Sequence, residues 1–259
     1  MRVAIAVDID YWLPEPADVL LQIEAAALPD QRIEAEELLV WSDTPIRAAA
    51  GEDGIGQRCW VHAHGRLEAR YRATVRVDRP AVDLASLRAT PPRLLPAELT
   101  AYLLPSRYCP ADRLYGFVRR KWGSMAGGPL AAALAAWVAT EIDYSADAVR
   151  PDATAADTFA ARAGVCRDFA HLLVTLARAG NIPARCVAVY APGVDPPDFH
   201  AVAELWLDGS WHLVDATGMA RAEDMARVVV GRDATDIAFM TIFGRAQLLR
   251  QSVQVTRLA

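Results

Sequence analysis

The chain has 259 residues, of which 53% are hydrophobic, so it can bury one large core or two modest ones. Its formal net charge is −5 and its basic residues are scattered, which argues against a nucleic-acid-binding protein. The most apolar stretch, residues 129–142, is too short to span a bilayer, and residues 1–16 lack the pattern of a signal peptide. We therefore expect a soluble cytoplasmic protein that binds neither nucleic acid nor membrane.

The four cysteines show neither a CxxC pair nor the spacing of a disulfide framework, so we expect free thiols in a reducing compartment. His62 and His64 form an HxH pair, a pattern that can bind metal. No third ligand of suitable spacing lies near them, and a surface strand is the favoured interpretation. The sequence has no calcium loop, glycine-rich phosphate loop or dinucleotide-binding fingerprint. It therefore predicts neither a metal nor a cofactor.

Short runs of alternating apolar and polar residues dominate the first part of the chain. Residues 2–11 and 32–41 fit strands, and residues 58–77 fit two strands that turn at His64 and Gly65. The proline-rich residues 79–110 exclude a long helix or a central strand and predict an ordered connector. We therefore predict an N-terminal β-rich domain over residues 1–95 and a second domain over residues 96–259.

The second part of the chain begins with helical patterns and ends with strands. We expect helices over 112–122, 129–142, 152–164 and 166–179, with Asp112 and Asp152 as N-caps of the first and third. Gly164 and Gly180 come where the last two helices end. Strands are predicted over 184–190, 199–207, 211–217 and 247–257.

Cys166 lies at the N-terminal end of the helix predicted for residues 166–179. The unpaired N–H groups and the positive dipole end of a helix favour a thiolate, which is the nucleophilic form of cysteine. The same N–H groups can stabilise an oxyanion that forms when the sulfur attacks a carbonyl. The alternative is that Cys166 is a small apolar core residue, and the position alone favours this alternative.

A predicted hairpin supplies a candidate base and its orienting partner. Asp208 and Gly209 separate two alternating apolar runs, which is typical of a two-residue hairpin loop. That loop places His200 and Asp215 on the same face of the sheet, diagonally opposite and within reach of each other. With the helix of Cys166 packed on this face, the three residues would form a Cys-His-Asp triad.

Three motifs carry these residues: GVCRDFAHLLVTLARAGNIPAR from position 164, FHAVAELW from position 199 and WHLVDATG from position 211. Together they resemble the transglutaminase-like superfamily, specifically its bacterial cysteine peptidase branch. Cys166, His200 and Asp215 occupy the catalytic positions of that pattern. Residues 105–109 and 231–239 also resemble flanking segments of bacterial members. Val202 and Ala216 depart from the commoner Trp and Pro, which leaves the choice of substrate open.

The resemblance implies an α+β fold in which a papain-like transglutaminase core, with the Cys-bearing helix packed on an antiparallel sheet, follows the N-terminal antiparallel β domain. It also implies acyl transfer on a peptide or protein amide through a thioester, with Cys166 as nucleophile, His200 as acid and base, and Asp215 as the orienting residue. Water as acceptor makes the protein a peptidase or amidase, and an amine makes it a transglutaminase. Bacterial relatives favour hydrolysis, while oligomeric state stays open.

Two alternatives belong to other classes. A non-catalytic scaffold would keep the fold and hold a peptide in its groove, but it would have no need of all three residues. A metal site at Cys166, His200 and Asp215 lacks a fourth ligand. Tyr108 is a candidate second oxyanion donor.

The remaining polar residues of these motifs are assigned lesser roles. Asp168 and His171 fit structural helix positions, and His212 faces away from Asp215. Glu204 either orients the loop before Cys166 or is solvated.

Overall fold

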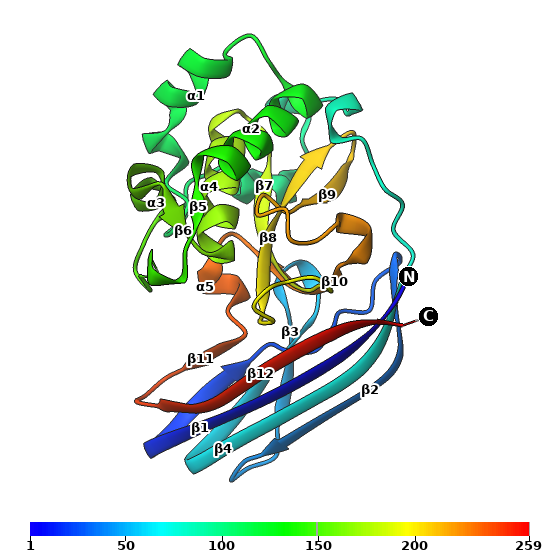
Figure 1. The fold of residues 1–259 in the computed structure, drawn as a ribbon, viewed down its shortest axis with the longest axis vertical. Helices are drawn as coiled ribbons and strands as arrows, with labels where there is room; N and C mark the ends of the chain where they lie inside the picture. The colour runs from blue at the N-terminus through cyan, green and yellow to red at the C-terminus, as the bar shows by residue number, and fades with distance from the viewer. Residues whose placement is uncertain (149, 259) are drawn as a thin grey trace.

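The structure, a computed structural model, describes residues 1–148 and 150–258. A six-stranded antiparallel sheet forms one end of the molecule (Figure 1). Its path is β11-β1-β4-β2, with β12 also paired to β1 and β3 to β4. The strands are β1 (Arg2–Leu21), β2 (Gln31–Trp41), β3 (Arg47–Ala50), β4 (Gln57–Val77), β11 (Met240–Ile242) and β12 (Gln247–Leu258). Residues of β1 and β4 alternate between buried and accessible, as the sequence pattern predicts.

The predicted turn at His64 and Gly65 is wrong, because β4 continues through both residues as a single strand. Gly65 has a φ of +76°, and its partner strand β1 is irregular between Leu13 and Ala17. The glycine therefore accommodates a local irregularity in a long strand pair, and β1 pairs with β4 on both sides of it.

The second layer is a four-stranded antiparallel sheet in the order β10-β7-β8-β9. It lies between the large sheet and the helices in Figure 1. Its strands are β7 (Ala184–Tyr190), β8 (His200–Leu207), β9 (Ser210–Val214) and β10 (Ala226–Gly231). The helices are α1 (Tyr115–Trp122), α2 (Gly127–Glu141), α3 (Ala155–Ala161), α4 (Cys166–Ala179) and α5 (Ala234–Ile237). The apolar face of α4 packs on β7 and β8, and α1, α2 and α3 contact α4.

Shorter elements join these layers. A parallel pair, β5 (Asp143–Tyr144) with β6 (Ala163–Gly164), lies before α4. The proline-rich connector forms short 3₁₀ helices, η2 (Leu84–Ser86), η3 (Pro92–Leu94) and η4 (Ala97–Tyr102), and η5 (Ala111–Arg113) follows it. Others are η1 (Glu52–Gly54), η6 (Ala146–Ala148) and η7 (Ala222–Asp224). In the described chain, no helix combines the length and apolar character needed to cross a membrane.

Two predicted helix caps are corrected. The N-cap of α3 is Thr154, because its hydroxyl accepts a bond from the Asp157 amide and the Asp157 carboxylate accepts one from the Thr154 amide. Asp152 lies outside this reciprocal pair. Asp112 falls within η5, and α1 begins only after Leu114.

One continuous hydrophobic core joins both layers, and it includes Val3 and Tyr71 of the large sheet as well as Leu172 of α4. This arrangement confirms the predicted α+β class. The boundary at residues 95 and 96 stays a prediction. The strand predicted over 247–257 is part of β12, and both β11 and β12 pair with β1, so that Arg2 lies opposite Leu258.

Candidate active site

Cys166 is the first residue of α4, as predicted, and it is partly exposed. The extended backbone of Val165 precedes it, and the Val165 amide donates to Asp168 Oδ2 at 3.0 Å. Asp168 is 2% exposed, and its Oδ1 also accepts from the Arg167 guanidinium at 2.8 Å. These contacts fix the first turn of the helix, which confirms the structural role predicted for Asp168. The sulfur of Cys166 lies 4.0 Å from the Phe199 carbonyl oxygen, at the start of β8.

The β8–β9 hairpin has the predicted register, with Leu207 opposite Ser210 and Trp206 opposite Trp211. It brings His200 Nε2 within 2.9 Å of Asp215 Oδ2, and both side chains are almost fully buried. The Asp215 carboxylate also accepts bonds from the amide and hydroxyl of Thr217 at 2.9 and 2.7 Å, and from the amide of Ala220 at 3.1 Å. Asp215 is therefore held in one orientation against the imidazole.

The other imidazole nitrogen, His200 Nδ1, is buried and has no hydrogen-bond partner among the described residues. Burial lowers the pKa of His200, but the hydrogen bond with Asp215 and the negative charges of Asp215 and Cys166 outweigh it and raise the pKa to about 9. Burial raises the pKa of Asp215, but the hydrogen bond from His200, its positive charge and the bonds from Thr217 together lower it by more, so the net change is downward. The imidazole thus has Asp215 on one nitrogen, and its other nitrogen is left without a partner in the described part of the chain.

A cavity of about 760 Å³ opens over Cys166 and His200. Phe199 and Phe239 stack in its wall with ring centroids 4.2 Å apart. Sequence reasoning missed both aromatic rings, and their separation along the chain gave no local signal. The large sheet also contributes to the wall, through Gln22 directly after β1, Thr241 of β11 and Gln251 of β12. Its other polar and aromatic lining residues include Arg107, Tyr108, Tyr144 and Arg167.

Both roles predicted for Glu204 are wrong. Its side chain is fully buried, and its carboxylate binds Arg185 at 2.7 Å and Arg227 at 2.8 Å. It therefore neither contacts solvent nor orients the loop before Cys166. His212 bonds to the Leu207 carbonyl oxygen, away from Asp215, as expected.

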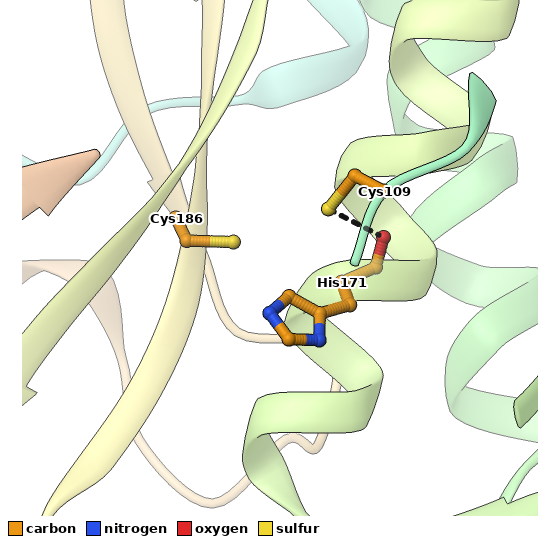
Figure 2. A group of neighbouring side chains, drawn as sticks. All are labelled: Cys109, His171 and Cys186. Carbon is orange, nitrogen blue, oxygen red and sulfur yellow. Dashed lines mark hydrogen bonds between the residues drawn. The ribbon is translucent and has the colours of Figure 1, made fainter. Parts of the chain in front are cut away.

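One other cluster could hold a metal by its residue types. The donor atoms of Cys109, His171 and Cys186 lie within 4.8 Å of one another and all three residues are buried. Figure 2 shows them converging from a loop, a helix and a strand, with the Cys109 thiol bonded to the His171 carbonyl oxygen at 3.6 Å.

The bonding of this cluster does not fit a metal site. His171 Nε2 accepts the Ala234 amide at 3.0 Å, which occupies that lone pair. Burial above all lowers the pKa of His171 to about 3. A hydrogen bond with Cys109, followed by burial, raises the pKa of the Cys186 thiol well above its ordinary value. His171 and Cys186 are therefore neutral packing groups, as predicted, and the expectation of no metal stays a prediction.

Comparisons with known proteins identify the family and the fold. Residues 120–216 match the family model of the transglutaminase-like superfamily. The crystal structure of a candidate cysteine protease from Cytophaga hutchinsonii has a TM-score of 0.93 and 30% identity, covering 100% of this chain and 91% of that one. The uncharacterized protein ML0607 of Mycobacterium leprae is 33% identical over 138 residues, which are 49% of this chain. That match spans 50% of the mycobacterial protein, about half its length.

Proposed function

The chain belongs to the transglutaminase-like superfamily, and we propose that it is a cysteine peptidase or amidase in which Cys166, His200 and Asp215 act as a catalytic triad. The observation that carries the proposal is the bridging position of His200, whose Nε2 lies 2.9 Å from Asp215 while its unpartnered Nδ1 remains for Cys166. The likeness to the candidate cysteine protease favours hydrolysis over transamidation.

The proposed reaction has two steps. In the first, the Cys166 thiolate attacks the amide carbonyl carbon, and the imidazolium of His200 gives its proton to the leaving amine as the C–N bond breaks. In the second, water attacks the thioester, His200 takes its proton, and the C–S bond breaks to release the carboxylic acid. Asp215 keeps the imidazole oriented and stabilises its charged form in both steps.

The test is acylation by p-nitrophenyl acetate, followed by release of p-nitrophenol and by intact mass. We expect the wild-type protein to form an acetyl-enzyme on Cys166, Cys166→Ser to form no thioester, and Cys59→Ser to behave as wild type because Cys59 is a buried cysteine outside the site. Failure of the wild-type protein to acylate faster than Cys166→Ser would overturn the proposal. Peptide cleavage against incorporation of a fluorescent primary amine then separates hydrolysis from transamidation.

A further inference from the structure

Attack on a carbonyl creates an oxyanion, and catalysis needs preorganised donors at the place where that charge develops. The Cys166 backbone N–H at the start of α4 can supply one donor. Two phenols, those of Tyr108 and Tyr144, line the same cavity as Cys166. The question is which of them stands beside the attacking sulfur.

The backbone of Tyr144 is fixed to the segment that leads into Cys166. In the β5–β6 pair Tyr144 lies opposite Gly164, two residues before the cysteine. The Asp143 amide donates to the Arg162 carbonyl at 2.8 Å, and the Ser145 amide donates to the Gly164 carbonyl at 2.9 Å. This short pair therefore holds Tyr144 and the start of α4 in a set relation.

The ring of Tyr144 extends toward the first turn of α4, where its centroid is 5.9 Å from that of Phe169. Burial is the first cause that raises the pKa of Tyr144, and the negative charge of Cys166 is the second. The Cys166 backbone N–H acts in the opposite direction. Tyr144 and Cys166 line the same cavity, and the pairing with Gly164 keeps Tyr144 beside the segment that leads into the cysteine. The raised pKa keeps its O–H protonated and able to donate at neutral pH.

Tyr108 is bound differently. Its ring lies flat on His171, with centroids 5.2 Å apart and planes only 2° from parallel. Its backbone amide donates to Asp233 at 3.0 Å, and Arg107 lies 5.0 Å from its ring centroid. These contacts account for the ring and the backbone of Tyr108 as packing groups, and its role as an oxyanion donor stays a prediction.

We infer that Tyr144 is the second oxyanion donor, its O–H acting together with the Cys166 N–H on the carbonyl oxygen of the substrate. The inference rests on the proposed function and adds a catalytic residue to it. An oxyanion donor should affect acylation of Cys166 but not its alkylation, and both rates can be measured. Acylation by p-nitrophenyl acetate passes through an oxyanion, whereas alkylation by iodoacetamide is a displacement that forms none.

The experiment compares Tyr144→Phe with Tyr108→Phe in both reactions. We expect Tyr144→Phe to slow acylation by about 100-fold, the effect typical of a lost oxyanion donor, and to leave alkylation of Cys166 unchanged within about two-fold. Tyr108→Phe keeps the ring stack and should change neither rate. The unchanged alkylation also shows that the Tyr144 variant is folded around a reactive thiol.

Three outcomes would overturn the inference. Tyr144→Phe could lower both rates equally, which would make Tyr144 a residue that supports the thiol. It could lower neither, or Tyr108→Phe could be the variant that slows acylation alone. If the wild-type protein alkylates but does not acylate, the proposed function fails first and this inference fails with it.

Discussion

Replacing Glu204 by glutamine should destabilise the protein far more than a surface charge change does. Glu204 is fully buried between Arg185 and Arg227, with N–O distances of 2.7 and 2.8 Å. Each arginine has a second carboxylate on the large-sheet side of the molecule: Arg185 binds Asp53 at 2.7 Å, and Arg227 binds Asp30. Glu204 is therefore the inner charge of a network that ties the two sheets together.

The expected magnitude follows from this geometry. Unit charges about 4 Å apart attract by about 4 kcal/mol at an effective dielectric constant of about 20, so Glu204 contributes two such interactions. Each arginine keeps its outer aspartate, and the neutral glutamine no longer pays the desolvation cost of a buried carboxylate. The net loss should equal that of other buried ion pairs from which one partner is removed. We expect the free energy of unfolding to fall by about 3–5 kcal/mol, and Tm by about 10 °C.

Urea unfolding followed by tryptophan fluorescence measures this change, since the chain has seven tryptophans and Arg185 lies 4.1 Å from the Trp211 ring centroid. Glu34→Gln is the matched control, because Glu34 also binds an arginine, Arg2, at 2.8 Å but on an accessible surface. We expect the control to cost less than about 1 kcal/mol. Equal losses in the two variants would refute the view that the buried network stabilises the fold.

Two further predictions concern the site itself. The pKa of His200 is raised from 6.5 to about 9 in the folded protein, so protonation of His200 stabilises the folded state. It adds about 3 kcal/mol to the free energy of unfolding, fully present below pH 6.5 and lost as pH rises through 9. Urea unfolding at pH 6.5 and 9.5 should show the loss in wild type and a smaller one in His200→Gln; equal losses would contradict the assignment. Gly164→Ala should cost about 1–3 kcal/mol and slow alkylation of Cys166, because its Cβ would lie 2.6 Å from Asp168 Cβ. Gly116→Ala, where only the Arg120 guanidinium is near, is the control, and equal behaviour of the two variants would exclude the clash.

The sequence was sufficient wherever a short segment determines its own geometry. The Asp208-Gly209 loop fixes the hairpin register, and that register alone brings His200 to Asp215. The apolar period from Phe169 and the break at Gly180 likewise give the bounds of α4. These local signals predicted that His200 and Asp215 lie side by side and that Cys166 begins α4.

Prediction failed where the outcome depends on distant segments. A polar residue such as Glu204 in a strand is ordinarily solvated, and nothing near it in sequence reveals that Arg227 and Asp30 complete a buried network. Gly65 indicated a turn in the sequence, and only the pairing of β1 with β4 on both sides of it shows that the strand continues. The pairing of β12 with β1 spans almost the full chain and has no local signature.

Residues of the large sheet line the cavity over Cys166 and support its wall. Gln251 of β12 donates to Asp198 at 2.6 Å, two residues before His200 in the loop that enters β8. The side-chain Nε2 of Gln22 donates to the carbonyl oxygen of Ala238 at 2.9 Å, and its backbone amide donates to the carbonyl oxygen of Phe239 at 2.8 Å. These bonds position the Phe239 ring, which stacks on Phe199. Both contacts act on the wall of the cavity over Cys166. The return of the C-terminal strands to the first sheet therefore helps to set the shape of the cavity in which the proposed chemistry takes place.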